Sequence, residues 1–318
     1  MQLKIEVLKI LEEERGRDIS GQALAERFGV SRNAVWKAVK ALQAEGYKIL
    51  AGQNKGYRLS DENDMLSAVG IADAIEHRVK GMSVYLHRTI DSTNNEAKRL
   101  IADGKTGTAL IVAEGQTAGR GRRGREFFSP ALTGIYMTFS FPSSMPLTDA
   151  VGITTATAVA VFLAIKDLTG VETEIKWVND IYLHGKKICG ILTEAISDFE
   201  SGCVQHIIVG VGMNYQTADF PRELKGIAGS LSPVGVNRNR MIARIVDRLL
   251  DILNGDVDYL AIYRQHSLVL GKEIVYERDG VKHEARALDI DEEGGLVVAH
   301  ADGSKTTLTS GEISLRLR

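Results

Sequence analysis

Gly115-Gln116-Thr117-Ala118-Gly119-Arg120-Gly121-Arg122-Arg123-Gly124-Arg125 is the stretch around which the chain is organised. It holds four glycines and four arginines in eleven residues. Glycines let a backbone bend closely around a ligand, and arginines bring fixed positive charges to it. The stretch therefore predicts a site for anionic oxygens. Because exposed arginines are common, a solvated basic loop is the alternative interpretation of these residues alone.

The glycines of this stretch also spell G-x-G-x-x-G, the fingerprint of dinucleotide-binding folds. That fingerprint needs a strand before it and a helix that opens at it. Residues 109–113 do have the pattern of a strand. However, the residues that follow the stretch, 134–139, have the pattern of a second strand and not of the helix that the fingerprint requires. We therefore reject a dinucleotide-binding fold.

Composition sets the class of protein. A chain of 318 residues with 44% hydrophobic and 25% charged residues has room for two or three globular domains. The net charge of −2 argues against indiscriminate coating of nucleic acid but allows a local basic face. Cys189 and Cys203 lie in apolar surroundings without metal-ligand spacing, which predicts buried, reduced thiols. The charged N-terminus lacks a signal sequence and no apolar run approaches membrane-spanning length, so we expect a cytoplasmic protein without a membrane partner.

The N-terminal residues have the pattern of a winged helix-turn-helix. Apolar residues at helical spacing predict a helix before Gly16, a second after the N-cap Ser20 and a third after the N-cap Ser31. Short strands at 47–50 and 57–59 then form a hairpin. The donors expected to contact DNA lie on the third helix and the hairpin: Arg32, Asn33, Trp36, Lys37, Lys40, Lys55 and Arg58. A module for protein contacts is the alternative, although such an interface is more often aromatic or apolar.

The middle of the chain places polar residues at the ends of predicted strands. Ser92-Thr93-Asn94 follows a strand at 83–87 and offers neutral donors and acceptors, while Thr93 and Glu96 have capping-box spacing. After a helix at 149–168, a hairpin at 180–187 leads into a buried strand. Since neighbouring strand residues face opposite sides, at most one of Lys186 and Lys187 points into a pocket.

The remaining strands complete an α+β, multidomain chain. From Gly271 onward, five short strands alternate with turns, which predicts a small SH3-like β-barrel. We expect a winged helix-turn-helix at 1–62, a central mixed sheet with helices at 63–268, like that of class II synthetases, and the SH3-like barrel at 269–318.

Several segments resemble the biotin protein ligases. The run Gly119–Gly124 resembles their G-R-G-R-R-G loop, and Lys176–Asp180 resembles their K-W-P-N-D motif with Val178 in place of the proline. Lys187–Leu192 is similar to K-x-x-G-I-L, which selects Lys187 rather than Lys186, and Gly210–Asn214 is similar to G-x-G-x-N. The N-terminus resembles the subgroup that also represses the biotin operon.

This resemblance implies joining of biotin to ATP, with Mg²⁺, to give biotinyl-5′-AMP, followed by transfer of biotin to a lysine of a biotin carboxyl carrier protein. It makes Arg122 and Lys187 catalytic. The residues it assigns to biotin are Ser92, Thr93, Asn94, Gln116, Arg120, Gly121, Arg122, Lys187 and Gly190. The residues it assigns to ATP are Arg120, Arg122, Arg125, Asn179, Asp180, Lys187 and Asn214, and no dedicated metal ligand is predicted. Thr217–Leu231 would be a flap over the adenine.

The resemblance also implies partners. The adenylate would act as corepressor, and the adenylate-bound homodimer would bind operator DNA. Two other readings remain: a repressor that senses biotin without catalysis, and a lipoate or octanoyl transferase. Arg122 together with Lys187 speaks against the first, and the arginine loop speaks against the second.

Overall fold

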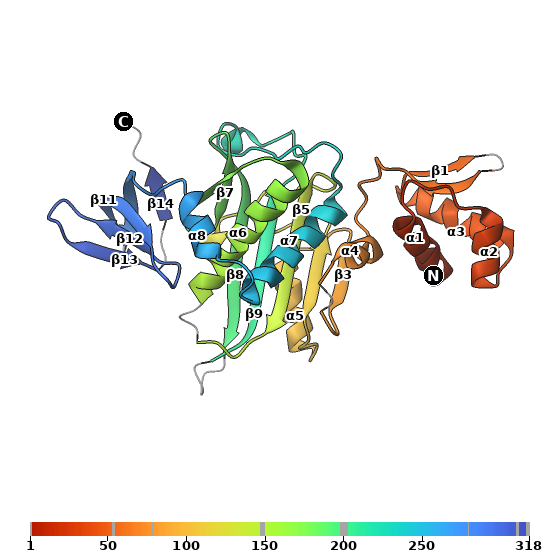
Figure 1. Ribbon diagram of the computed structural model, residues 1–318, viewed down its shortest axis with the longest axis horizontal. Coiled ribbons are helices and arrows are strands. Elements are labelled where there is room, and N and C mark those ends of the chain that lie inside the picture. The colour runs from red at the N-terminus through yellow and green to blue at the C-terminus, as the bar shows by residue number, and fades with distance from the viewer. Residues whose placement is uncertain are drawn as a thin grey trace. The chain divides into compact units, whose positions relative to one another are not determined.

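The computed structural model describes residues 2–52, 55–77, 79–146, 150–197, 203–278, 280–309 and 312–315. The chain forms two compact units (Figure 1). One comprises Met1–Arg78 with Val234–Arg244, and the other comprises Val79–Pro233 with Ile245–Arg318.

The first unit contains the predicted helix-turn-helix and hairpin. Its elements are α1 (Gln2–Glu13), α2 (Gly21–Phe28), α3 (Arg32–Ala44), β1 (Ile49–Gly52) and β2 (Gly56–Leu59). The hydroxyls of Ser20 and Ser31 accept hydrogen bonds from the backbone three residues on, at 3.0 and 3.2 Å, so both predicted N-caps are confirmed. Strands β1 and β2 pair antiparallel. Gln53 and Asn54, at the tip of the predicted hairpin, lie outside the described residues.

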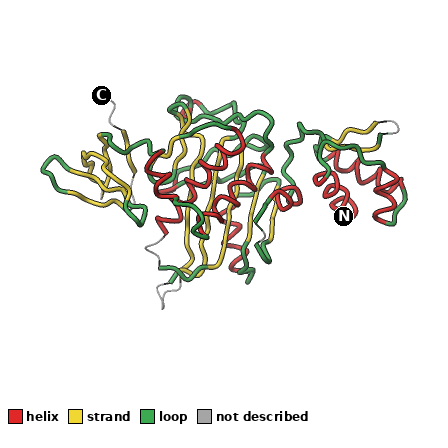
Figure 2. The backbone as a smooth tube through the Cα atoms, in the orientation of Figure 1, coloured by secondary structure: helices red, strands yellow, loops and turns green. Residues whose placement is uncertain are grey.

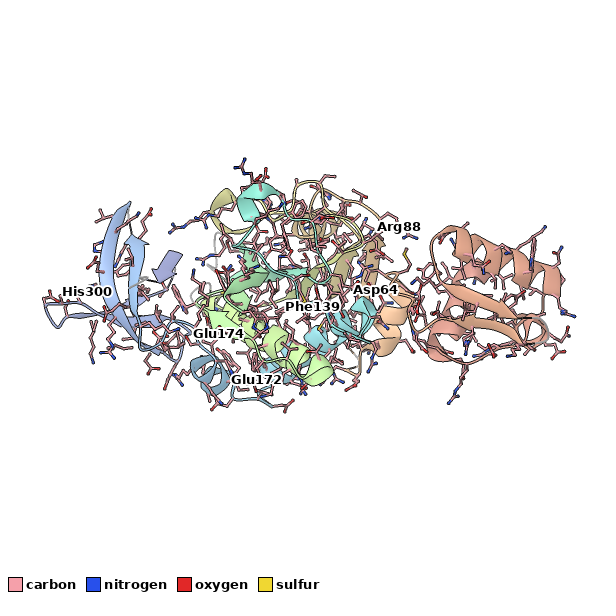
Figure 3. All side chains as sticks on the ribbon, turned by 90° about the horizontal axis from the view of Figure 1, so that it is seen from above. Asp64, Arg88, Phe139, Glu172, Glu174 and His300 are labelled. Atoms are coloured by element: carbon pink, nitrogen blue, oxygen red, sulfur yellow. The ribbon has the colours of Figure 1, made fainter. Side chains whose placement is uncertain are left out.

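The first unit extends beyond the hairpin. Helix α4 (Ala68–Ala74) ends where Ile75 adopts an extended conformation. Helix α7 (Arg238–Leu253) begins in this unit. The Arg238 side chain is 1% exposed, and its Nε donates to Asp64 Oδ2 at 2.8 Å (Asp64 is labelled in Figure 3). This ion pair between the buried Arg238 and the partly exposed Asp64 joins the segment after the hairpin to the first turn of α7.

The second unit is built on a mixed sheet of seven strands, which confirms the predicted central sheet. In spatial order the strands are β3 (Ser83–His87), β4 (Ala109–Ala113), β5 (Gly134–Pro142), β9 (Val204–Asn214), β8 (Lys186–Ser197), β7 (Asp180–Leu183) and β6 (Glu174–Lys176). Strands β3 and β4 are parallel, and the other neighbours are antiparallel. Phe139, labelled in Figure 3, is 2% exposed on β5 and marks the buried centre of this sheet.

Helices cover both faces of the sheet (Figure 2). Helix α5 (Thr93–Ala102) packs on β4, β5 and β9, and its Ala97 belongs to an apolar cluster with Ile208. Helix α6 (Ala150–Thr169) packs on β6, β7 and β8, where Thr154 donates to Thr193 at 2.8 Å. Ile208 pairs with the residue after Thr193, so the two helices lie on opposite faces. Helix α8 (Tyr259–Gln265) packs on α6.

One expectation about apolar runs was wrong. Residues Gly152–Thr169 of α6 are long and apolar enough, by length and composition, to cross a membrane. However, 67% of this window is buried inside the protein. Such burial is the property of a core helix, and α6 packs on the sheet as expected for one.

The C-terminal strands form a five-stranded antiparallel sheet, but the predicted SH3-like barrel is not confirmed. The strands are β10 (Glu273–Arg278), β11 (Val281–Ile290), β12 (Leu296–Ala299), β13 (Lys305–Leu308) and β14 (Glu312–Leu315). Their order is β13-β12-β11-β10-β14, and over the residues described here β13 and β14 are unpaired edges rather than neighbours that close a barrel.

The two cysteines differ in burial. Cys189 on β8 is fully buried, and burial raises the pKa of its thiol. Cys203 is partly exposed, so the prediction of two buried thiols holds for Cys189 alone.

Candidate active site

A cavity of about 340 Å³ lies in the second unit. Its walls come from the arginine loop, the start of α5, the β6–β7 turn and strands β8 and β9. Most predicted site residues line it, namely Ser92, Thr93, Asn94, Gln116, Arg120, Gly121, Arg122, Arg125, Asn179, Asp180, Lys187 and Gly190. Residues far apart in the sequence thus meet around one space.

The arginine loop folds back on itself between β4 and β5. Phe127 N donates to Gly119 O at 2.8 Å, and Gly121 N donates to Arg125 O at 2.7 Å. A Cβ atom at Gly119 would lie 2.5 Å from Ser129 Oγ, and Gly124 has a φ of +73°, so both positions favour glycine. The loop contains one short 3₁₀ turn, η1 (Arg122–Gly124), before β5. This geometry agrees with our rejection of a dinucleotide-binding fold.

The loop arginines contact different walls of the cavity. Arg120 Nη2 donates to Asn95 Oδ1 on α5 at 2.7 Å and lies 3.6 Å from Glu194 Oε2 on β8. Arg122 Nη1 donates to Asn179 Oδ1 at 3.4 Å. The two guanidinium groups therefore hold the loop over the cavity from opposite sides.

Lys187 is the lysine that faces the cavity. Its Nζ lies 2.7 Å from Asp180 Oδ1. Lys186 is exposed and does not line the cavity, as strand alternation together with the family pattern predicted. A Cβ atom at Gly190 would lie 3.1 Å from Lys187 Nζ, so this glycine leaves room for the amine. The charge of Lys187 is thus fixed by a carboxylate across the β7–β8 hairpin.

The turn that carries Asn179 and Asp180 is held by several hydrogen bonds. Asn179 Nδ2 donates to Ile191 O at 2.8 Å, and Tyr263 Oη donates to Val178 O at 3.3 Å. Trp177 lines the cavity, and its Nε1 donates to Gly294 O at 3.0 Å. The Trp177–Val178 peptide is cis. Sequence reasoning did not assign a role to Trp177, because its partner follows more than a hundred residues later.

The start of α5 forms a polar corner of the cavity. Thr93 N donates to Gln116 Oε1 at 2.9 Å, and Asn94 Nδ2 donates to Glu194 Oε2 at 2.9 Å. The predicted capping box is wrong by one residue: the N-cap is Ser92, its side chain makes no cap bond, and Thr93 already lies within the helix. Glu96 instead accepts a hydrogen bond from Arg99 at 2.8 Å.

Glu194 is a charged residue near this corner that sequence reasoning missed. Burial would raise the pKa of Glu194, but hydrogen bonds from Lys98 and Asn94 and the charge of Arg120 outweigh it, so the pKa lies below its ordinary value. Glu194 is therefore a carboxylate at neutral pH. The sequence did contain a signal for it, because a glutamate on a strand of mostly apolar residues needs polar partners.

The glycines of β9 make room for side chains from other segments. A Cβ atom at Gly210 would lie 2.3 Å from Asn94 Oδ1. A Cβ atom at Gly212 would lie 2.7 Å from the ring of Phe127, which lines the cavity. The glycine spacing of this strand therefore shapes the cavity wall.

Replacing Gly212 with alanine is expected to destabilise the protein by about 1–3 kcal/mol, because Phe127 must move. Denaturant unfolding monitored by circular dichroism measures this. The matched control is Gly107→Ala, where a Cβ atom meets nothing within 4 Å and no positive φ is involved. Equal stability of the two variants would contradict the packing described here.

Asn214 is the predicted site residue that the cavity does not include. It is 5% exposed at the end of β9, and its Oδ1 has no hydrogen-bond partner among the described residues. Its backbone O accepts from Leu231 N at 3.0 Å, at the end of the predicted flap. The flap itself reaches the cavity through Ile227, whose O accepts from Lys187 N at 2.9 Å.

The predicted DNA-contacting residues lie together on the first unit. Those on α3 are all exposed, and Trp36 is 49% exposed. On the hairpin, Lys55 is exposed, whereas Arg58 is half-buried and lies 3.6 Å from Asp18 Oδ1. The α3 side chains are thus available to a partner, and Arg58 is already paired.

The mixed sheet, arginine loop and cavity define the class of protein. Residues 86–214 match the biotin/lipoate A/B protein ligase family. Residues 4–58 match an HTH domain, and residues 269–316 match the biotin protein ligase C terminal domain.

Similar proteins narrow this class to one family. The chain is 33% identical to the bifunctional ligase/repressor BirA of Bacillus subtilis (strain 168) over 323 residues, covering 98% of each chain. It is 30% identical to that of Escherichia coli (strain K12), covering 93% of this chain and 92% of the relative. The structure of the biotin protein ligase from Aquifex aeolicus in complex with biotin and ATP aligns with a TM-score of 0.60 and 26% identity, over 75% of this chain and 99% of that one. The chain belongs to the family of bifunctional biotin ligase/repressors.

Proposed function

We propose that the protein activates biotin with ATP to biotinyl-5′-AMP and transfers the biotinyl group to one lysine of a biotin carboxyl carrier protein. Family membership supports this proposal. The observation that carries it is the single cavity, in which a corner of neutral polar groups at Ser92–Asn94 meets the cationic groups of Arg122 and Lys187. The neutral corner suits the cyclic urea of biotin, and the cations suit phosphate and carboxylate oxygens.

In the first step, a biotin carboxylate oxygen attacks the α-phosphorus of ATP and pyrophosphate leaves. Two anions approach each other, so Arg122 and Lys187 stabilise the transition state by their charge. The substrate supplies the nucleophile. Because Asp180 fixes Lys187 Nζ at 2.7 Å, the amine is held in place before substrates bind. In the second step, the carrier lysine attacks the acyl carbon and AMP leaves.

The cavity fits a magnesium ion that arrives with ATP. Its lining offers the carboxylates of Asp180 and Glu126 and the amide oxygen of Asn179. A site with only a few protein oxygens is suitable for Mg²⁺, because this ion usually keeps several water ligands and binds nucleotide phosphates. Asp180 would hold the ion. When bound, Mg²⁺ supplies charge neutralisation on the phosphates.

The proposal is tested by biotin-dependent exchange of pyrophosphate into ATP. Exchange with biotin is the expected result. Biotin binding without exchange would make the protein a biotin-sensing repressor, and exchange with octanoate or lipoate in place of biotin would make it a relative of the lipoate ligases.

We further propose that the first unit represses biotin genes by binding operator DNA, with biotinyl-5′-AMP as corepressor and a homodimer as the binding form. The exposed donors of α3 support this role, since they suit phosphates and base edges in a major groove. We also propose that the chain has three domains, with boundaries after residues 62 and 268, and that the protein is cytoplasmic.

Lys37→Ala is expected to weaken DNA binding and to lower the slope of log K against log salt by about 0.9, because one phosphate contact is lost. Fluorescence anisotropy with a labelled duplex at several salt concentrations measures the slope. Lys9→Ala, which removes an exposed lysine of α1, is the control. An unchanged slope for the Lys37 variant would contradict its contact with phosphate.

A further inference from the structure

The buried hydroxyl of Thr138 lies behind the polar corner of the cavity. Thr138 is 0% exposed on β5 and is not part of the cavity lining. Its Oγ1 lies 2.6 Å from Asn94 Oδ1 and 2.8 Å from Thr93 Oγ1. Both of those residues line the cavity. Thr138 can therefore influence a bound ligand through them.

Glu194 fixes the orientation of the Asn94 amide. Asn94 Nδ2 lies 2.9 Å from Glu194 Oε2 and 3.3 Å from Leu192 O. A backbone carbonyl and an ionised carboxylate only accept hydrogen bonds, and Lys98 Nζ at 2.7 Å helps to keep Glu194 ionised. The amide nitrogen must face these acceptors, so the amide oxygen faces Thr138.

The direction of the next two hydrogen bonds follows from counting protons. Thr138 has one hydroxyl proton, and the Asn94 amide oxygen has none to give, so Thr138 donates to Asn94. Either hydroxyl of the Thr138–Thr93 pair can donate, but the proton of Thr138 is already used. Thr93 Oγ1 also lies 3.3 Å from Gln116 Oε1, which already accepts from Thr93 N, whereas its contact with Thr138 is shorter at 2.8 Å. Thr93 therefore donates to Thr138 and presents lone pairs toward the cavity.

We propose that Glu194, Asn94 and Thr138 form a hydrogen-bond relay that makes Thr93 an acceptor for an N–H group of the ligand. Thr138 is then a positioning residue for substrate specificity. The inference rests on the proposed function, in which that N–H group belongs to the cyclic urea of biotin. The relay selects a head group that donates hydrogen bonds at this corner.

The test compares Thr138→Val, which keeps the shape and loses the hydroxyl, with Thr138→Ser, which keeps the hydroxyl. Calorimetric titration of the full chain with biotin is expected to show about tenfold weaker binding for the valine variant, from loss of a hydrogen bond within the site. The serine variant is expected to bind like wild type. In the exchange assay, the valine variant should raise KM for biotin and leave KM for ATP unchanged.

A matched control and a second ligand separate the relay from general damage. Thr154→Val removes a hydroxyl that donates to Thr193 Oγ1 at 2.8 Å, outside the relay. This variant is expected to bind biotin normally. Desthiobiotin keeps the cyclic urea, so the valine variant should lose affinity for it by the same factor as for biotin.

Three results would overturn the relay: wild-type biotin affinity in Thr138→Val, equal losses in the valine and serine variants, or an equal loss in Thr154→Val. Failure of wild type to bind biotin at all would instead contradict the proposed function.

Discussion

Lys187→Ala is expected to lower the rate of biotin-dependent pyrophosphate exchange by roughly 100- to 1,000-fold, because a fixed positive charge at the reacting phosphate is lost. The amine lies 2.7 Å from Asp180 Oδ1, so its removal also leaves this carboxylate without its cation in the cavity. The variant also lacks the positive charge that attracts the phosphates of ATP in the ground state. The loss should therefore appear in both kcat and the KM for ATP.

The neighbouring lysine provides the control. Lys186→Ala removes the same side chain from the same strand, but Lys186 is exposed and faces away from the cavity. Its exchange rate should stay within about twofold of wild type, as for most surface changes. Equal losses in both variants would show that the effect arises from the surface charge of the hairpin, and would remove Lys187 from the site.

Arg122→Gly is expected to release biotinyl-5′-AMP into solution, where it labels lysines of bystander proteins. Arg122 belongs to the loop at the cavity and reaches Asn179 on the opposite wall at 3.4 Å. Without this contact the loop closes less firmly over the reactive mixed anhydride, and water and foreign amines gain access. The measurement is biotinylation of serum albumin present beside the carrier domain.

The adjacent arginine tests whether the effect is specific. Arg123 also lines the cavity, but it is exposed, and its φ of +56° is a conformation that glycine adopts without strain. Arg123→Gly therefore removes one arginine from the same loop at little conformational cost, and albumin should stay unlabelled. Specific labelling of the carrier by Arg122→Gly would contradict the role given to Arg122.

Features with a local cause could be predicted from the sequence. Ser20 and Ser31 cap helices because each hydroxyl lies next to the N–H groups that need it. The choice between Lys186 and Lys187 follows from strand alternation together with the family pattern. The helix-turn-helix was predicted from such local patterns, whereas the mixed sheet and most of the cavity lining were expected from the resemblance to the biotin protein ligases.

Features that depend on distant partners could not be predicted. The glycines of β9 were visible, but their purpose depends on Phe127 and Asn94, which arrive from other segments. Closure of a barrel depends on pairing between its first and last strands, which a series of short strands in the sequence does not reveal. The strand pattern therefore supported a C-terminal sheet but not the predicted SH3-like barrel. Thr93 and Glu96 do have the spacing of a capping box, but the Thr93 hydroxyl forms a hydrogen bond with Thr138 instead of capping the helix.

The most direct measurement of the central claim is transfer of labelled biotin, with ATP and Mg²⁺, to a folded apo carrier domain. A carrier whose acceptor lysine is replaced by arginine serves as the control. The account predicts that wild type labels the first carrier and leaves the second unlabelled. Binding of biotin without labelling of either carrier would contradict the assignment of the cavity as a ligase active site.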